Sequence, residues 1–255
     1  MGISSPVPKL WCLHGNLQTE AVWQPFSNAF TLPAYPDERT APRLKLRTVD
    51  LWSDRPSDID AWVHGFCHRV LNECGGTRQF LLGYSLGGRL ALHAAAAKPD
   101  LWRGVIAVAA HPGIKDPIAR RRRLEADRSW GNRFLSESWC AVMAGWNAQP
   151  VFRGGTKPET PADGAIDRES VFHWFDRCST GRQRHLTPDL EALAQPPILY
   201  ITGSEDINYC EFGRKLAASC PCLTHRIVPG TGHRVPWEDS HGFCKAVQSF
   251  ISEIR

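Results

Sequence analysis

The sequence predicts an α/β fold, in which a mostly parallel β-sheet is flanked by helices and a helical cap is inserted. Two observations support this prediction. Short apolar runs alternate with helical patterns at both ends of the chain, and the alternation stops between about Pro112 and Pro196. Strands that alternate with helices form parallel sheets covered on both faces. The 255 residues are enough for one large domain with a sizeable core.

The elements of the core follow from the order of apolar runs and helical patterns along the chain. The expected strands are Leu10–Leu13, Leu44–Leu51, Phe80–Gly83, Val105–Ala110, Ile198–Thr202 and His225–Val228. The expected helices of the core are Asp58–Leu71, Leu86–Ala97, Glu211–Ala218 and Ser240–Ile254.

The stretch between the two parts of the core has no strand pattern and is too long to be a loop. We therefore expect a core of residues 1–111 and 197–255, and a helical cap of residues 112–196. The expected parts of the cap are the helical pieces Ile118–Arg128, Trp130–Ala144 and Ile166–Cys178, with a loop rich in Gly, Pro and Thr at Gly154–Gly164.

The most informative local pattern is a Gly-x-Ser-x-Gly motif, Gly83-Tyr84-Ser85-Leu86-Gly87, between a predicted strand and a predicted helix. A serine on a sharp strand-to-helix turn needs flanking glycines, because side chains there would clash. Such a turn raises the serine hydroxyl toward a substrate. The motif alone is compatible with an inert turn, but this context predicts that Ser85 is catalytic.

The sequence also offers partners for this serine. A serine hydroxyl needs an adjacent imidazole, and the imidazole needs a carboxylate that fixes its tautomer. In enzymes with this turn the chain order is Ser, acid, His. Here Asp206 follows a predicted strand and His233 ends a Gly-Thr-Gly-His sequence. We predict a triad of Ser85, Asp206 and His233, with Glu205 as an alternative acid; an ordinary turn aspartate would also fit position 206.

An oxyanion hole requires two backbone N–H groups directed at developing negative charge. The residue after the serine, Leu86, is expected to supply one of them. The loop Leu13-His14-Gly15-Asn16-Leu17 follows an early strand, and Asn16 is the expected second donor. His14 and His111 also follow predicted strands and are candidates for lining the pocket.

Composition and charge exclude several classes of function. The chain is 42% hydrophobic and 22% charged, with a formal net charge of +4 and no basic stripe interleaved with aromatic residues. We therefore expect no nucleic-acid partner. No apolar stretch is long enough to span a bilayer, so no membrane insertion is expected. Met1–Lys9 has no basic or apolar signal region. We expect a cytoplasmic protein that is a monomer or a weak homo-oligomer.

The nine cysteines are an odd number and are scattered, which is typical of reduced thiols in a cytosolic protein. Cys220-Pro221-Cys222 is spaced too tightly for a zinc-binding pair, and no second pair lies near it. The sequence therefore predicts no metal site and no cofactor.

With these motifs, the chain resembles the α/β-hydrolase superfamily over nearly its whole length. Within it, the chain looks most similar to the 2-succinyl-6-hydroxy-2,4-cyclohexadiene-1-carboxylate (SHCHC) synthases, lyases of menaquinone and phylloquinone biosynthesis. The resemblance rests on three stretches: Gly83–Ala91, His111–Trp130 with its arginine-rich helix, and Trp146–Phe152. Two loops depart from the family pattern. Asp50–Asp54 replaces an Asp-Leu-Pro-Gly-His-Gly loop, and Asn16 stands where an aromatic residue is common.

The resemblance implies an α/β-hydrolase fold and the elimination of pyruvate from a succinyl-enolpyruvyl-cyclohexene carboxylate. The triad would then act as a base: His233 would deprotonate Ser85, and the alkoxide would take a proton from the ring. The N–H groups of Asn16 and Leu86 would hold the oxyanion that forms on the succinyl ketone.

This small-molecule substrate carries several carboxylates, so its pocket needs fixed cations. Arginine suits this role because its planar fork binds carboxylates through two parallel hydrogen bonds. The resemblance assigns the role to Arg89, Arg123 and Arg168. In the run Arg120–Arg123 the four side chains cannot all face one way on a helix, and we expect Arg123 alone to reach the pocket.

Three aromatic residues complete the expected binding site. Tyr84 lies beside the serine and is expected to contact the substrate. Trp146 and Phe152 belong to the stretch that resembles the family's cap, and they are candidates for lining the pocket. They would equally fit as ordinary core of the cap.

Two other classes of function stay open. A serine hydrolase acting on an ester, a thioester or a carbon–carbon bond would use the same triad. A carboxylesterase for neutral esters, however, would not need Arg89 and Arg123 near the serine. A binding protein without catalysis on this fold would not require an intact triad.

Overall fold

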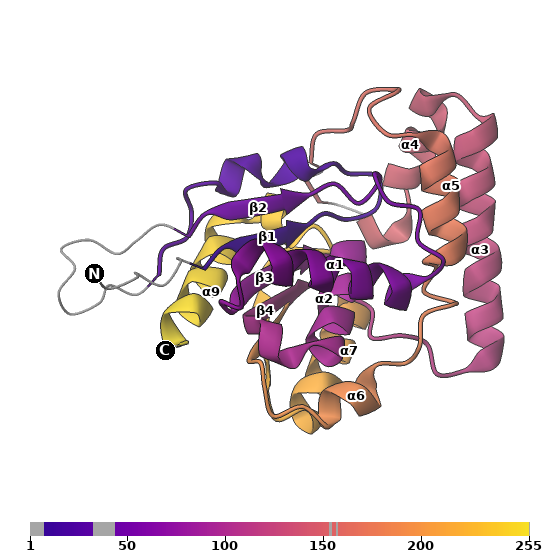
Figure 1. The fold of residues 1–255 in the computed structure, drawn as a ribbon. Coiled ribbons are helices and arrows are strands. Elements are labelled where there is room, and N and C mark those ends of the chain that lie inside the picture. The colour runs from indigo at the N-terminus through magenta and orange to yellow at the C-terminus, as the bar shows by residue number, and fades with distance from the viewer. Residues whose placement is uncertain (1–7, 33–43, 153–154, 157, 255) are drawn as a thin grey trace.

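The computed structural model describes residues 8–32, 44–152, 155–156 and 158–254. These residues form a parallel sheet with the strand order β2-β1-β3-β4-β5-β6. The strands are β1 (Leu10–Leu13), β2 (Leu46–Val49), β3 (Gln79–Tyr84), β4 (Trp102–Val108), β5 (Ile198–Gly203) and β6 (Leu223–Val228). Figure 1 shows the sheet in the middle of the molecule. The predicted α/β fold with a parallel sheet is confirmed.

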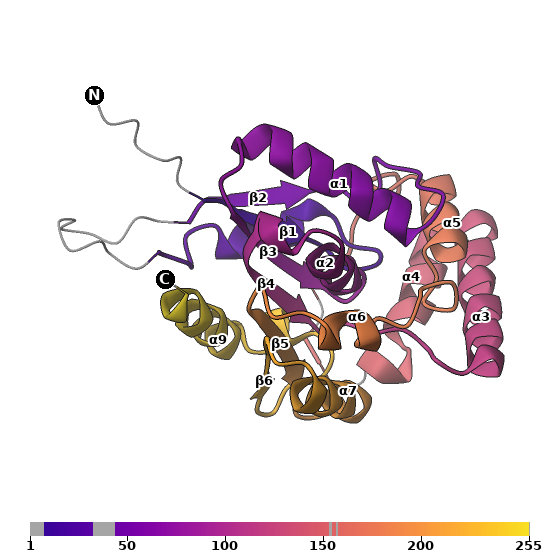
Figure 2. The ribbon, with the colours of Figure 1, turned by 60° about the horizontal axis from the view of Figure 1, so that its bottom comes forward.

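Helices cover both faces of this sheet (Figure 2). One face packs against α1 (Ile59–Cys74), α2 (Leu86–Ala97) and α7 (Ile207–Ser219). The other face packs against the 3-10 helix η1 (Glu20–Phe26), α8 (Val235–Glu238) and α9 (Ser240–Glu253). The predicted core helices are present, whereas η1 and α8 were not predicted because each is too short to give a clear periodic pattern.

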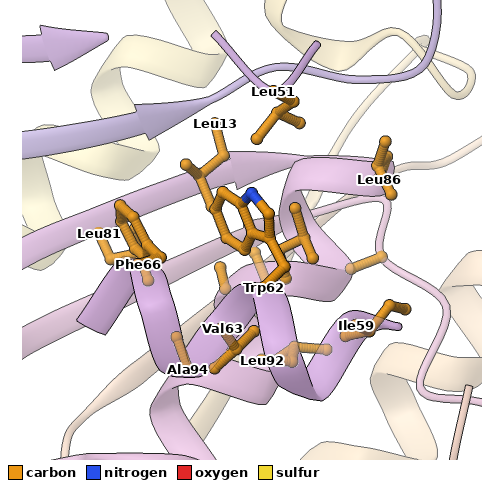
Figure 3. Packing of buried hydrophobic residues seen from close by; sticks show 14 of the residues in the cluster. Leu13, Leu51, Ile59, Trp62, Val63, Phe66, Leu81, Leu86, Leu92 and Ala94 are labelled. Carbon is orange, nitrogen blue, oxygen red and sulfur yellow. The ribbon is translucent and has the colours of Figure 1, made fainter. Parts of the chain in front are cut away.

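The alternation of side chains along each strand builds the two layers of core. In β3, Leu81 belongs to the cluster under α1 and α2, while Phe80 and Leu82 belong to the cluster under α9. Figure 3 shows Trp62 and Phe66 of α1 beside Leu81 of the sheet. The two aromatic rings are stacked with centroids 4.9 Å apart. Burying side chains of this size stabilises the fold by about 1.5–3 kcal/mol each.

The segment between β4 and β5 is helical. It contains α3 (Pro117–Ser136), α4 (Trp139–Asn147), the short 3-10 helix η3 (Pro150–Phe152), α5 (Arg168–Arg177) and α6 (Thr187–Glu191). Helices α3, α4 and α5 stand together at one end of the sheet (Figure 1). In contrast, α6 packs against α2 and α7 of the core. The bounds 112–196 for a separate cap therefore stay a prediction.

The first two helices of this segment divide at a different place from the one expected. The sequence predicted a break near Ser129, but α3 continues through it to Ser136. Trp130 and Phe134 lie one turn apart, and Phe134 stacks on Phe175 of α5, which favours continuation of the helix. The chain leaves the helix at Glu137 in an extended conformation, and Ser138 caps α4 by accepting from the N–H of Ala141.

Some sequence-based expectations fall partly outside the described residues. These are the absence of a signal region in Met1–Lys9, of which residues 1–7 are not described, and the loop Gly154–Gly164, of which residues 154 and 157 are not described. Across the described ranges, no helix has the length and apolarity needed to cross a bilayer.

The turn between β3 and α2 depends on backbone contacts that leave no room for side chains. A Cβ atom at Gly83 would lie 2.1 Å from the carbonyl oxygen of Gly87. A Cβ at Gly87 would lie 2.3 Å from the carbonyl oxygen of Leu13 in β1. Real Cβ atoms do not approach backbone atoms so closely, so β1, β3 and α2 can meet here only through glycine.

We expect Gly83→Ala to lower the free energy of unfolding by about 2 kcal/mol or more, because the backbone of the turn must shift. Gly65→Ala is the matched control: a Cβ at Gly65 on α1 meets nothing within 4 Å. That control should stabilise the protein by about 0.5–1 kcal/mol through helix propensity. Urea unfolding measures both. Equal stability of the two variants would contradict the close packing described here.

Candidate active site

Ser85 lies on the sharp turn between β3 and α2, as the first residue before the helix. Its backbone has φ 51° and ψ −104°, a conformation that a residue with a side chain rarely adopts. Two backbone hydrogen bonds hold it there: the N–H of Ser85 donates to Val108 (2.8 Å), and its carbonyl accepts from the N–H of Arg89 (3.0 Å). The turn lies at the carboxyl end of β3, beside the point where the strand order reverses between β1 and β3. Ligands of open α/β sheets bind at this point.

His233 and Asp206 lie next to Ser85 in a continuous chain of hydrogen bonds. The Nδ1–H of His233 donates to Asp206 Oδ2 over 2.6 Å, and Nε2 of the same ring faces the Ser85 hydroxyl at 3.3 Å. The side chains of His233 and Asp206 are 3% and 8% exposed. An ionised aspartate accepts the Nδ1 proton, which leaves Nε2 free to take a proton from the serine. The alternative acid, Glu205, is exposed and makes no such contact with His233 among the described residues.

The two expected oxyanion donors belong to the turn of this serine and to the neighbouring turn after β1. Leu86 is the first residue of α2, so its N–H has no partner within the helix. Asn16 lies in the turn after β1 and lines the same cavity as Ser85. This turn is tied to the serine turn, because the N–H of Gly87 donates to the carbonyl of His14 over 3.1 Å.

His14, a candidate for lining the pocket, is instead a buried structural residue. Its Nδ1 donates to the carbonyl of Gly15 over 2.9 Å, and its Nε2 accepts from the N–H of Leu51 over 3.1 Å. Burial lowers its pKa to about 4. The ring is therefore neutral at pH 7 and joins the turn after β1 to the loop after β2.

Two chambers border Ser85. The larger chamber has a volume of about 700 Å³, enough for a small organic ligand, and is also lined by Asp206 and His233. The smaller chamber borders the serine as well. Both chambers share Asn16, Ser85, Trp146 and Phe152. The two aromatic residues expected from the cap therefore line both chambers, as the serine does.

Arg123 lines the larger chamber and is held by a carboxylate. Its Nε donates to Asp127 over 2.8 Å, and its side chain is 38% exposed. Burial opposes its charge, but Asp127 and Tyr209 raise its pKa above the ordinary value. The neighbouring Arg121 and Arg122 are exposed, and Arg120 donates to the carbonyl of Gly181. Arg123 is thus the residue of this run that faces the cavity.

The other two predicted arginines do not line either chamber. Arg89 is 5% exposed, and its guanidinium donates to Gln183 Oε1 over 2.6 Å and to the carbonyl of Cys178. It therefore joins α2 to the segment that returns from α5. Arg168 donates to the carbonyls of Phe134 and Glu137 and pairs with Asp163. Neither geometry directs these guanidinium groups at the serine, and their substrate-binding roles stay predictions.

Several residues of the cavity were missed by the sequence analysis. Tyr209 and Phe212 of α7 line the larger chamber, and the Tyr209 ring is 4.7 Å from that of His233. Arg234 lines the smaller chamber next to Tyr84. The position of Arg234 directly after the histidine was a usable signal. Nothing in the sequence distinguished Tyr209 from other aromatic residues on a helix.

His111, the other strand-end histidine, does line the larger chamber. Its Nδ1 accepts from the N–H of Gly113 over 3.0 Å. Burial, together with the charges of Arg123, Arg89 and His185, lowers its pKa to about 3. The ring is therefore neutral in the folded protein at pH 7.

The cysteines and acidic side chains give no sign of a metal centre. All nine cysteines are free thiols. In the ranges that the structure describes, no group of three or more His, Cys, Asp or Glu side chains is arranged to hold a metal ion.

Sequence comparison shows which family the chain belongs to. Residues 12–246 match the alpha/beta hydrolase family. The chain belongs to that family. It is 33% identical to a 2-succinyl-6-hydroxy-2,4-cyclohexadiene-1-carboxylate synthase of Serratia proteamaculans, over 96% of this chain and 93% of the relative. It is 28% identical to a synthase of the same name from Pectobacterium atrosepticum, over 98% and 97% of the two chains. The protein is therefore an enzyme of this superfamily that resembles the SHCHC synthases.

Solved structures agree on the fold. The MenH protein of S. aureus superposes with a TM-score of 0.80 at 20% identity, over 96% of this chain and 94% of the other. A Bacillus subtilis carboxylesterase, CesB, superposes with a TM-score of 0.68 at 16% identity, over 97% and 85% of the two chains. At these identities the likeness shows the fold of the enzyme alone.

The neutral histidines make the stability of the enzyme depend on pH. The folded-state pKa values of His111 and His14, about 3 and about 4, lie below the ordinary histidine value of 6.5. Between these values the unfolded chain binds more protons than the folded one, so stability is lost as the pH falls below about 6.5. Each ring contributes about 1–2 kcal/mol of this loss between pH 7 and pH 5.

Urea unfolding at pH 7 and pH 5 measures the effect for His111→Gln, with His64→Gln at an exposed site of α1 as control. We expect His111→Gln to lose less stability than the wild type on acidification, and His64→Gln to lose as much as the wild type. An unchanged pH dependence in His111→Gln would contradict the neutral ring.

Proposed function

We propose that the enzyme is an SHCHC synthase, which eliminates pyruvate from 2-succinyl-5-enolpyruvyl-6-hydroxy-3-cyclohexene-1-carboxylate in menaquinone or phylloquinone biosynthesis. The observation that carries the proposal is the 33% identity over nearly full length to a relative of that name. The hydrogen-bonded chain from Asp206 to Ser85, next to a chamber that contains Arg123, supports it.

In this mechanism the triad moves a proton and forms no covalent bond to the substrate. Asp206 holds the His233 ring with Nδ1 protonated, and Nε2 takes the hydroxyl proton of Ser85. The serine alkoxide takes a proton from the ring carbon of the substrate. The 3.3 Å between Nε2 and Oγ is a long hydrogen bond, which would tighten once the substrate is bound.

The electrons of the broken C–H bond pass into the ring, and charge develops on the oxygen of the succinyl ketone. The N–H groups of Asn16 and Leu86 would stabilise this oxyanion. Return of the electrons breaks the ring C–O bond, and pyruvate departs as its enolate. The proton stored on the triad then returns to the leaving group, so the reaction consumes no water.

The charges of the site suit a polyanionic substrate. Arg123 is kept in place by Asp127, whose second oxygen accepts from the hydroxyl of Ser179 over 2.7 Å. Its free N–H groups can bind a substrate carboxylate. Tyr84, Trp146 and Phe152 would pack on the ring and the succinyl chain. Arg89 would act by fixing the cap to α2 unless the substrate reaches it.

The enzyme would act in the cytoplasm on a small molecule, as a monomer or weak homo-oligomer, without a cofactor. The nine free thiols agree with a reducing compartment. Hydrolysis of an ester, a thioester or a carbon–carbon bond by the same triad is the alternative. The two chemistries are distinguished by their products.

Ser85→Ala should slow pyruvate release by at least about two to three orders of magnitude, because the base is lost. Pyruvate formed from the succinyl-enolpyruvyl substrate is followed with lactate dehydrogenase. Ser129→Ala, at an exposed position of α3, is the control and should keep wild-type activity. Near-native release by Ser85→Ala would reject the mechanism. Failure of the wild type to release pyruvate, with rapid turnover of p-nitrophenyl esters, would favour the hydrolase.

Replacement of Asp206 and replacement of its neighbour Glu205 should have very different effects on kcat. Asp206→Asn removes the acceptor that fixes the His233 tautomer and should lower kcat by about 10²–10⁴-fold. Glu205→Gln changes an exposed carboxylate and should alter kcat by less than about threefold, since the hydrogen bond from His233 stays intact. Steady-state kinetics on both variants measures the difference. Similar losses in the two variants would mean that the acid is misassigned.

A further inference from the structure

The smaller chamber contains a buried arginine to which the catalytic proposal gives no role. Arg234 directly follows His233, is 5% exposed, and lines this chamber together with Ser85 and Tyr84. Arg123 lines the larger chamber and is not part of the smaller one. Ser85 borders both, so each arginine lines a chamber that reaches the serine.

The charge of Arg234 has no acidic partner in the part of the chain that the structure describes. No carboxylate oxygen there lies within 4.0 Å of its guanidinium, although most described arginines of the cap have such a partner. Its nearest interactions are with neutral groups: it donates to the amide oxygen of Asn147, and its charge lies 4.0 Å from the centre of the Phe152 ring. Burial lowers its pKa, and Tyr84 and Glu238 oppose this shift.

The neighbouring carboxylates do not neutralise it directly. The carboxylate of Glu238 accepts hydrogen bonds from the backbone N–H of Gly232 and from that of Arg234 itself, the latter over 3.0 Å. Glu159 also borders the chamber but is exposed. A buried cation without a counter-ion is costly, and an anionic group of a ligand would remove that cost.

The size of the chamber limits what the anion can be. Its volume is about 30 Å³, which is room for one or two water-sized groups and not for a whole ligand. Besides Arg234, Tyr84 and Asn147 border it; the Asn147 amide is already engaged, since its nitrogen donates to the carbonyl of Met143 over 2.9 Å and its oxygen accepts from Arg234. A planar guanidinium beside neutral hydrogen-bonding groups fits one end group, a carboxylate.

We propose that Arg234 forms a second carboxylate subsite, which binds one end of a polycarboxylate while Arg123 binds the other. This inference deepens the proposed function and rests on it for the identity of the substrate. The ligand would span both chambers across Ser85, with its anionic ends held apart. Arg234 would then be a specificity-determining residue, because a substrate with a single carboxylate cannot engage both arginines.

A ligand-binding role and a structural role of Arg234 predict different effects of its replacement on the thermal midpoint of unfolding. If Arg234 holds the fold together, its replacement lowers the thermal midpoint. If it is an uncompensated charge kept for a ligand, Arg234→Met of similar volume should unfold at the same or a higher temperature than the wild type. A clear fall in the midpoint would overturn the proposal.

The binding test uses succinate as the probe and calorimetry as the readout, which requires no turnover. We expect the wild type to bind succinate, Arg234→Met and Arg234→Gln to bind it about 10- to 100-fold more weakly, and Arg234→Lys to lie in between. Dimethyl succinate, the neutral analogue, should have the same affinity for the wild type and for all of these variants. Arg128→Gln is the matched control, because Arg128 is exposed and pairs with Asp176 outside both chambers.

Equal succinate affinity in the wild type and Arg234→Gln, or no binding by the wild type, would overturn the subsite.

Steady-state kinetics separates the subsite at Arg234 from the proposed function. With the succinyl-enolpyruvyl substrate, Arg234→Gln should raise KM by about 10- to 100-fold with little change in kcat. If the wild type binds succinate through Arg234 but releases no pyruvate, the subsite stands and the proposed reaction is wrong. Pyruvate release with an unchanged KM would leave the reaction standing and overturn the subsite.

Discussion

The site depends on one backbone contact, between the turn at Ser85 and the end of β1. Gly83 and Gly87 let β3, α2 and β1 approach until a single Cβ would collide with a carbonyl oxygen. This contact holds Ser85 at a positive φ angle and brings the turn that contains Asn16 beside the first residue of α2. The strain in the serine backbone is supported by the buried sheet on both sides. The other residues of the site, such as Asp206 and His233, come to this turn from loops that are far apart in the sequence.

Positive charge is placed differently in the two chambers around Ser85. Arg123 faces the larger chamber with a carboxylate partner, whereas Arg234 is buried at the smaller one and, among the described residues, has no carboxylate partner. Arg89, which the sequence suggested for the same purpose, is bonded to Gln183 and to a carbonyl of the segment after α5. Its buried guanidinium joins α2 to the cap through these hydrogen bonds. The same residue type therefore has three different physical roles around one serine.

Much of this arrangement could be predicted from the sequence, because it depends on local patterns. The alternation of apolar runs gave the sheet, and the glycine-flanked serine with later acid and histidine gave the three side chains that lie together. The division between α3 and α4 could not be predicted, since it depends on Phe134 packing against Phe175 of α5. Arg168 shows the same limit, because its guanidinium is bonded to the carbonyls of Phe134 and Glu137 through tertiary packing. For Arg234 the sequence did hold a signal, since it directly follows His233.

The central claim is that Ser85 passes a proton and is never acylated, so that water takes no part in the reaction. The mass of the ring product tests this most directly, together with the mass of the intact protein during turnover. The account predicts a product equal to the substrate minus pyruvic acid, and an unmodified protein. A ring product heavier by one water, or a substrate-derived adduct on Ser85, would contradict it.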